Sequence, residues 1–204
     1  MQREDVSELH YIAPIENLSS ILSVGLLSHH KARFITHGSV ADPEVQARRS
    51  RKAVPAGKQL HRYVNLYFNA RNPMLFRRRD QHTDIVVLAI RPEVLDLPGV
   101  FITDGNAANV ATAFMTPTPI NFALLDADEL HAEYWSRENM TSIEREEARR
   151  RRCAEVLVPN HVNRSYIDRV YCSCDASRER IVLGGCTIDV VKREFMFFLP
   201  RERS

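Results

Sequence analysis

The residue whose position most suggests chemistry is Glu155, a single carboxylate at the start of an apolar, β-branched segment. A charged run ends at Arg149–Arg152, and Glu155-Val156-Leu157-Val158 follows almost at once. In a strand, Glu155 and Leu157 point to one face of the sheet and the two valines to the other. Because an isolated buried carboxylate is very unfavourable, Glu155 must be solvated, paired or used in catalysis. From this segment alone, an ion pair with one of the four preceding arginines is the simplest interpretation.

Positive side chains are gathered in three short clusters, although the net charge of the 204 residues is only +2. The clusters are Arg48–Lys52, Arg77–Arg79 and Arg149–Arg152. If they converge in space, they form an anion-binding site without an extreme isoelectric point. For each cluster taken alone, a solvated surface is an equally good interpretation.

The four cysteines and the ends of the chain point away from a metal site and from export. Cys153, Cys172, Cys174 and Cys186 form a C-x-C pair with two distant residues, which matches no common zinc pattern. Neither a secretory signal nor an apolar run of membrane-spanning length is apparent. We therefore expect no metal, reduced cysteines and a cytoplasmic, bacterial protein without membrane contact. The length and ordinary composition favour one domain over residues 1–204.

Short strands separated by irregular segments predict an α+β domain that positions these residues. The expected strands cover residues 9–13, 62–69, 84–91, 100–103, 155–158, 167–172 and 195–199. The expected helices cover 15–25, 43–52, 141–152 and 175–184, with one alanine-rich helix after Asp104-Gly105-Asn106. The spacing of Thr141 and Glu144 predicts a capping box. The long irregular segment 28–42 is of the kind that is usually functional.

Four segments, taken together and in order, resemble a known family. They are LHYIAPIENLSSILSVGLLS at 9–28, RRSRKAVP at 48–55, YVNLYFNARNPMLF at 63–76 and AEVLV at 154–158. This combination resembles DarT, the DNA ADP-ribosyltransferase toxin of the DarT–DarG toxin–antitoxin systems. The resemblance covers nearly the whole chain and is weakest after about residue 185.

The resemblance implies an ADP-ribosyltransferase-like fold, in which two small sheets and flanking helices surround an NAD⁺-binding cleft. It implies Arg49 and Glu155 as catalytic residues. Residues 32–50 correspond to an element that covers NAD⁺, and residues 106–155 to a loop that reads the substrate. Asn106 stands where some members have histidine, which leaves its role open. The cofactor-binding residues implied by position are His10, Tyr11, Ile12, Ser20, Leu27, Arg49 and Tyr67.

The chemistry of this reaction suits those residue types. Cleavage of the nicotinamide–ribose bond builds positive charge on the sugar, which a nearby carboxylate such as Glu155 stabilises. Tyr67 could stack on the nicotinamide ring or exclude water. Arg49 can hold a phosphate or charge that develops on the acceptor base. A guanidinium is a poor base, since its unperturbed pKa lies above roughly 12, so the group that removes the base proton stays open.

The implied acceptor is single-stranded DNA, which arginine clusters and exposed aromatic side chains can bind. For the arginines a solvated surface, and for the aromatic residues a small satellite core, are the structural alternatives. The implied partner is a DarG-like macrodomain antitoxin, and we expect a monomer. The candidate DNA-binding residues are Arg51, Arg77, Arg78, Tyr134, Trp135, Arg150 and Arg152.

We therefore expect a toxin enzyme that transfers ADP-ribose from NAD⁺ to a DNA base, with thymine as the expected base and release of nicotinamide. Guanine is the alternative base. A protein ADP-ribosyltransferase or an NAD⁺ hydrolase on the same fold is a second alternative. A non-catalytic module that binds nucleic acid through its arginine clusters is a third, and it would be indifferent to NAD⁺ and to replacement of Glu155.

Overall fold

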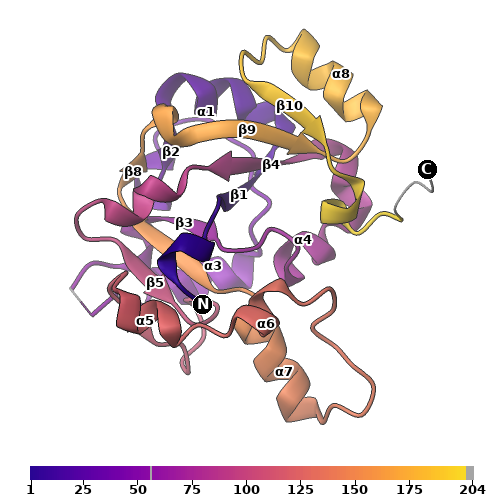
Figure 1. The fold of residues 1–204 in the computed structure, drawn as a ribbon. Coiled ribbons are helices and arrows are strands. Elements are labelled where there is room, and N and C mark those ends of the chain that lie inside the picture. The colour runs from indigo at the N-terminus through magenta and orange to yellow at the C-terminus, as the bar shows by residue number, and fades with distance from the viewer. Residues whose placement is uncertain (56, 201–204) are drawn as a thin grey trace.

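An eight-stranded sheet organises the computed structural model, which describes residues 1–55 and 57–200 (Figure 1). Its strand order is β10-β9-β4-β1-β3-β7-β5-β6. Neighbouring strands are antiparallel, except that β10 runs parallel to β9. A separate antiparallel ribbon pairs β2 with β8. The strands are β1 Leu9–Pro14, β2 Leu26–Leu27, β3 Tyr63–Tyr67, β4 Ile85–Ile90, β5 Phe101–Thr103, β6 Phe114–Met115, β7 Glu155–Pro159, β8 His161–Val162, β9 Ile167–Cys172 and β10 Asp189–Lys192.

The large sheet consists of two halves that meet at a single residue pair. Within the halves the ladders are long, from Leu9↔Ile90 to Pro14↔Ile85 between β1 and β4, and from Tyr63↔Pro159 to Tyr67↔Glu155 between β3 and β7. Between β1 and β3 the one pair is His10↔Tyr67. Figure 1 shows β9 and β4 apart from β3 and β5, with β1 between them. The two expected small sheets are thus halves of one sheet, and the expected α+β class is confirmed.

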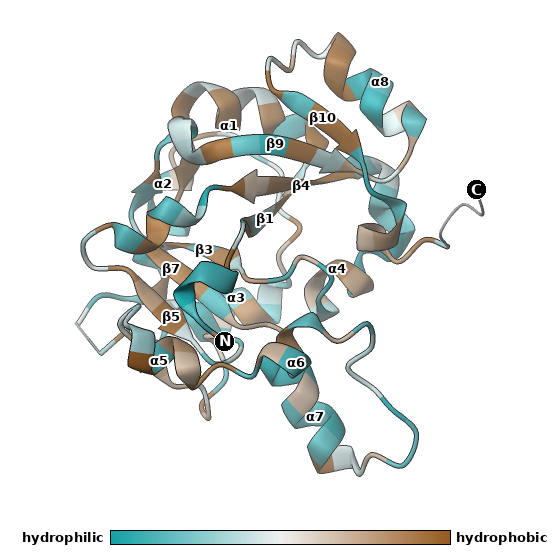
Figure 2. Ribbon diagram, viewed as in Figure 1, coloured by the Kyte–Doolittle hydropathy of each residue, from teal (hydrophilic) through white to brown (hydrophobic). Residues whose placement is uncertain are grey.

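Apolar side chains cover both faces of the sheet. All of β4 is buried, as its continuous apolar run predicts. One face carries a large cluster that includes Val64, Leu66, Val156 and Val158. The opposite face carries two smaller clusters, one around Ile12 and Tyr67 and the other around Tyr63 and Leu157. Figure 2 shows the hydrophobic strands in brown and hydrophilic residues in teal along α7. The core is therefore interrupted on one face, beside the junction of the two halves.

Local sequence accounts for the helices that flank this face. Asp42 caps α3, because its carboxylate accepts hydrogen bonds from Glu44 N (2.9 Å) and Val45 N (3.3 Å). Thr141 and Glu144 form the predicted capping box at α7. The helices are α1 Leu18–Val24, α2 His29–Ala32, α3 Pro43–Ser50, α4 Pro73–Arg77, α5 Pro119–Ala123, α6 Ala127–His131, α7 Ser142–Arg151 and α8 Asp175–Leu183.

The alanine-rich helix expected after Asp104-Gly105-Asn106 is wrong. These residues form a turn that runs to β6, because polar side chains bind backbone N–H groups that a helix would need for itself. Asn109 Oδ1 accepts from Ala111 N at 2.9 Å, and Asp104 Oδ1 accepts from Ala113 N at 2.8 Å. Short Asn and Asp side chains compete with helix formation in this way.

The strand expected at Phe195–Leu199 is also wrong. Within residues 1–55 and 57–200 the last strand is β10, and Glu194–Phe197 forms a 3₁₀ turn instead. The Arg71 guanidinium lies over the rings of Phe195 (4.0 Å) and Phe198 (4.3 Å), and Phe198 has a left-handed backbone with φ of 67°. A residue in that region cannot continue a strand.

Over residues 1–55 and 57–200, no helix has the length and apolar character needed to cross a membrane. In the same part of the chain, no group of three or more His, Cys, Asp or Glu side chains is arranged to hold a metal ion.

Candidate active site

A cavity of about 580 Å³ lies where the core is interrupted. Both halves of the sheet line it, since Ile12 comes from β1, Tyr67 from β3 and Glu155 from β7. Arg49 of α3 closes one side, and the turn after β5 lines another through Asn106. Its size falls within the range typical of small-molecule sites.

The Glu155 carboxylate is buried in this cavity, with 1% of the residue exposed, and it is bound on two sides. Arg49 Nη1 donates to Oε1 at 3.1 Å and to Oε2 at 2.9 Å. The backbone N–H of Ala107 donates to Oε1 at 3.0 Å. A buried carboxylate is therefore paired, as its burial requires. The interpretation that one of the four preceding arginines is its partner is wrong, because the partner is Arg49, which lies 106 residues earlier.

A buried threonine holds the backbone of Glu155. Thr103 Oγ1 accepts from Glu155 N at 2.9 Å and donates to Gly105 O at 2.7 Å, with Glu155 O at 3.3 Å. The hydroxyl thus joins the start of β7 to the turn after β5. Sequence reasoning missed Thr103 and Ala107, and no local signal marks them, because their partners are distant in the chain.

Tyr67 connects the two halves of the sheet beside the carboxylate. It is the register partner of both His10 and Glu155. Burial raises the pKa of its phenol well above the usual value, and the negative charge of Glu155 raises it further. The phenol therefore remains a hydrogen-bond donor at neutral pH. Tyr63 and Asn65 line the same cavity, and the two-residue period of β3 was the signal that could have identified them.

Two histidines next to Arg49 also line the cavity. The rings of His29 and His61 lie 4.2 Å apart. Burial lowers the pKa of both, and nearby positive charge lowers it further, from His37 and Arg49 for His29 and from His29 and Arg49 for His61. Both imidazoles are therefore predominantly neutral at pH 7. The histidines of segment 28–42 were the available signal for this wall.

The segment expected to cover NAD⁺ is bound across one side of the cavity. The Asn17 amide makes two hydrogen bonds with the backbone of Gly38, at 2.8 and 2.9 Å. Arg78 Nε donates to Val40 O at 3.1 Å, and Arg77 Nη1 pairs with Asp42 Oδ2 at 3.0 Å. Gly38, Val40 and Asp42 all line the cavity. Two of the candidate DNA contacts thus also hold this segment.

The structure brings eight of the candidate site residues to one cavity. They are Tyr11, Ile12, Leu27, Arg49, Tyr67, Arg77, Arg150 and Glu155. His10 lies outside the lining and contacts Glu8 Oε1 through Nε2 at 3.1 Å. Ser20 is exposed on α1, away from the cavity. Arg51 is exposed beyond the end of α3.

Arg150 and Arg152 were expected to contact DNA phosphates, but the structure places both guanidinium groups inside the protein. Arg152 is 1% exposed and donates to the carbonyl oxygens of Arg71 (2.8 Å), Glu129 (3.2 Å) and Leu130 (2.5 Å). Burial lowers its pKa to about 10, so it stays charged at neutral pH. Arg150 is 7% exposed and is paired with two carboxylates. Neither side chain is presented to a phosphate.

The two aromatic candidates differ in exposure. Trp135 is half-buried and packs edge-to-face against Phe76 (5.4 Å) and Phe198 (5.7 Å), which matches the satellite-core alternative. Tyr134 is 62% exposed, with the Arg71 guanidinium 5.8 Å from its ring centre. Of the two, Tyr134 offers the free aromatic face.

Comparison with known proteins identifies similar sequences over most of the chain. A family model described as "ssDNA thymidine ADP-ribosyltransferase, DarT" matches residues 10–189. A DNA ADP-ribosyl transferase–DNA ADP-ribosyl glycohydrolase fusion protein of Thermosipho africanus is 32% identical over 200 residues, which is 95% of this chain and 50% of the relative. A DNA ADP-ribosyl transferase of Thermus aquaticus is 32% identical over 140 residues, or 63% of this chain and 62% of the relative. The chain thus spans about half the length of the first relative and less than two thirds of the second.

Solved structures have the same fold. Thermosipho africanus DarTG in complex with ADP-ribose matches with a TM-score of 0.82 at 28% identity, over 96% of this chain and 52% of that chain. Thermus sp. 2.9 DarT in complex with ADP-ribosylated single-stranded DNA matches with a TM-score of 0.80 at 24% identity, over 96% and 99% of the two chains. At 24% identity, the second match supports a shared fold and nothing more.

Proposed function

Since the chain belongs to the DarT family of single-stranded DNA thymidine ADP-ribosyltransferases, we propose that it transfers ADP-ribose from NAD⁺ to a thymine base in single-stranded DNA. The observation that carries the proposal is the buried Glu155–Arg49 pair in a cavity between the two halves of the sheet. The carboxylate at that position can stabilise positive charge, and the guanidinium can donate hydrogen bonds to a group that carries negative charge.

Features of the cavity fit NAD⁺ as the co-substrate. Ser28 Oγ is buried and has no hydrogen-bond partner among residues 1–55 and 57–200, and it lies between two lining residues, Leu27 and His29. The Nδ1 atom of His10 is also buried and unpartnered over the same residues, but His10 lies outside the cavity lining. The Ser28 hydroxyl is thus the one of the two that a polar ligand atom in the cavity could satisfy. Arg49, Tyr67, Tyr11, Ile12 and Leu27 would hold the cofactor, whereas the exposed position of Ser20 gives it no part.

In the proposed reaction, the bond between the ribose anomeric carbon and the nicotinamide nitrogen breaks, and a bond from that carbon to a ring nitrogen of thymine forms. Nicotinamide leaves as a neutral molecule, and the proton on the thymine nitrogen is released. Glu155 stabilises the positive charge that builds on the sugar, and the hydrogen bond from the Ala107 N–H holds its carboxylate in one orientation. Tyr67 excludes water beside it.

Arg49 would serve the acceptor base rather than remove its proton. A guanidinium remains protonated near neutral pH and can donate to a base oxygen as negative charge develops there. This role requires the Arg49–Glu155 contact to loosen when substrates bind. Arg49 would then pair with Glu155 in the free protein and with the acceptor base in the complex.

We place the DNA strand along the outer rim of the cavity. Arg77 lines the cavity and is exposed, and Tyr134 offers an exposed ring for a base. Arg78 follows Arg77 in the sequence, and Arg51 belongs to the cluster that also contains Arg49. An antitoxin partner with DNA ADP-ribosyl glycohydrolase activity, of the DarG type, belongs to the same proposal. Its support is the Thermosipho africanus relative, which joins the two activities in one chain. Because NAD⁺ and DNA are both present in the bacterial cytoplasm, we propose that the protein acts there.

The test is mass spectrometry of four short oligonucleotides, each with one kind of base at the centre, after incubation with the protein and NAD⁺. We expect a mass increase of one ADP-ribose on the thymine oligonucleotide. Glu155→Ala should abolish it, whereas Glu179→Ala, which replaces an exposed glutamate on α8, should leave it unchanged.

Modification of the guanine oligonucleotide alone would overturn the choice of base. If only protein becomes labelled, DNA is not the substrate and the chain is a protein ADP-ribosyltransferase. If nicotinamide is released without any acceptor, it is an NAD⁺ hydrolase. Binding of DNA that is indifferent to NAD⁺ would favour a non-catalytic module.

A further inference from the structure

The turn between β5 and β6 supplies one of the two donors to the Glu155 carboxylate, yet it contains no helix or strand that would hold it. Ala107, whose N–H donates to Glu155 Oε1, lies near its middle and is fully buried. The position of that N–H therefore depends on contacts made by the rest of the turn.

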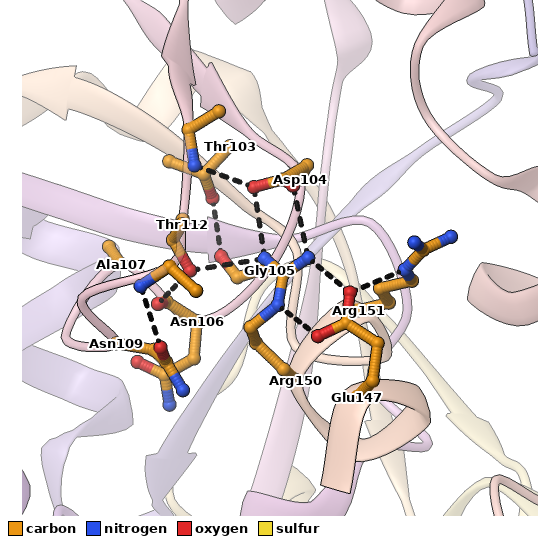
Figure 3. Close-up of polar contacts among 12 residues, drawn as sticks. Thr103, Asp104, Gly105, Asn106, Ala107, Asn109, Thr112, Glu147, Arg150 and Arg151 are labelled. Atoms are coloured by element: carbon orange, nitrogen blue, oxygen red, sulfur yellow. Dashed lines mark hydrogen bonds and ion pairs between the residues drawn. The ribbon is translucent and has the colours of Figure 1, made fainter. Parts of the chain in front are cut away.

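One side of the turn is bound by Arg150 of α7 (Figure 3). Arg150 Nη1 and Nη2 donate to the two carboxylate oxygens of Asp104, each at 3.0 Å. Nη1 also lies 3.3 Å from Thr112 Oγ1, and the Arg150 carbonyl accepts from Asn106 N at 3.1 Å. These contacts reach the beginning, the middle and the end of the turn from a single residue.

Arg150 is itself held rigidly on α7. Its Nε donates to Glu147 Oε2 at 2.8 Å and its Nη2 to Glu147 Oε1 at 2.7 Å, so all three guanidinium nitrogens are used. Two bidentate pairs fix the plane of the guanidinium as well as its position.

The turn is packed closely against Arg150 and is also held from its other side. A Cβ atom at Gly105 would lie 2.9 Å from Arg150 Cγ and 3.0 Å from its carbonyl oxygen, so this position has room for glycine only. On the opposite side, Lys52 Nζ donates to Asn109 O, and within the turn Thr112 Oγ1 donates to Asn106 O at 2.7 Å. The turn is thus held between the end of α3 and the end of α7.

We infer that Arg150 is a positioning residue for the reaction, and that with Asp104 it fixes the turn so that the Ala107 N–H orients the Glu155 carboxylate. This inference rests on the proposed function. The positioning role replaces the DNA contact that the sequence led us to expect for Arg150. The physical reason is that a carboxylate stabilises a transition state best when its orientation is set before the substrate arrives.

The test compares Asp104→Asn with Asp84→Asn. Asp104→Asn removes the charge that binds Arg150 to the turn but retains an oxygen for Ala113 N. Asp84→Asn is the matched control, because Asp84 pairs with Arg180 at an exposed position and neither residue lines the cavity. We expect Asp104→Asn to lower kcat about 10–100-fold with little change in KM for NAD⁺, and Asp84→Asn to leave it unchanged. Arg150→Lys should show an intermediate loss, since one ammonium retains the charge without the bidentate geometry.

The rate of amide hydrogen exchange at Ala107 relative to the rates in β7, followed by NMR, supplies a readout that a general loss of stability would not change, because such a loss accelerates both. In Asp104→Asn we expect faster exchange of the Ala107 amide while the amides of β7 keep their protection. If Asp104→Asn does not fold, Thr112→Val removes one hydroxyl from the same network and should give a smaller change of the same kind.

Unchanged kcat in Asp104→Asn, or an equal loss in Asp84→Asn, would overturn the inference. So would equal acceleration of exchange at Ala107 and throughout β7. The exchange measurement needs no substrate, so it tests whether Arg150 and Asp104 hold the turn even if the wild-type protein fails to modify DNA. That failure would refute the proposed function instead.

Discussion

Arg49 and Arg150 are both buried arginines that line the cavity, and they are bound in different ways. Among the residues that the structure describes, Arg49, on α3, contacts a single carboxylate through one nitrogen, Nη1. Arg150, on α7, contacts two carboxylates through all three guanidinium nitrogens. A guanidinium whose donors are all used is part of the framework. One that contacts a single partner can exchange it for a ligand, so the difference separates a chemical role from a positioning role.

The largest expected effect is that of Arg49→Ala. Loss of the guanidinium should lower kcat/KM on the order of 10²–10³-fold, since removal of one preorganised donor has that effect in other enzymes. It should also destabilise the fold by about 3–5 kcal/mol, because Glu155 becomes an unpaired buried charge. Steady-state kinetics and urea unfolding measure the two effects.

The double variant Arg49→Ala/Glu155→Gln separates these two effects. Because no unpaired charge remains, part of the stability should return while the protein stays inactive. Activity of Arg49→Ala within a few-fold of wild type would remove the distinction between Arg49 and Arg150.

The second-largest expected effect is that of Arg152→Met. Arg152 donates to backbone carbonyl groups, so this variant extends the comparison to an arginine with a structural role alone. The variant keeps the apolar stem but leaves three carbonyl groups without their donor, so unfolding free energy should fall by roughly 3 kcal/mol. Urea unfolding measures the loss. Arg151→Ala is the matched control, and its half-exposed ion pairs predict a loss of about 1 kcal/mol or less. Equal losses in both variants would contradict this assignment.

Arg77→Ala tests whether an exposed arginine at the rim contacts DNA or only holds the covering segment. A phosphate contact predicts weaker DNA binding and a salt-dependence slope that is smaller by about 1. Titration of a fluorescent oligonucleotide at several salt concentrations measures the slope. Asp42→Asn is the control, since it breaks the same ion pair from the other side. If both variants change NAD⁺ binding equally and the salt-dependence slope stays the same, Arg77 holds the covering segment and does not contact DNA.

The smallest effect is the pH dependence of Glu147→Gln. Hydrogen bonds from Arg150, and then from Arg151, lower the pKa of Glu147 from 4.5 to about 2. A carboxylate with a lowered folded-state pKa stabilises the fold above its unfolded pKa and loses that contribution as pH falls towards the folded value. The wild type should therefore exceed the variant in stability at pH 6, and the difference should shrink between pH 4.5 and about 2. Urea unfolding at pH 6 and pH 3 would reveal it, and a constant difference would contradict it.

Much of the framework could be predicted from local pattern. The apolar run at 84–91 predicts β4, the alternation at 63–67 predicts β3, and Thr141 with Glu144 predicts the cap of α7. The two failures arose where side chains override pattern. Asp104 and Asn109 bind backbone N–H groups that a helix would use, and the Arg71 guanidinium packs over Phe198.

The sequence by itself determined most of the longer strands and helices, the place of a carboxylate at the start of a strand and, through the order of its motifs, the family. Only the tertiary structure decided which arginine pairs with that carboxylate and what the other arginines do. Four consecutive arginines look alike in sequence, yet Arg150 and Arg152 are buried and Arg151 is half-exposed. The reason is that local periodicity sets which way a side chain points, whereas its partner is set by the segment that the topology brings opposite to it. For Glu155 that segment is α3, 106 residues earlier in the chain.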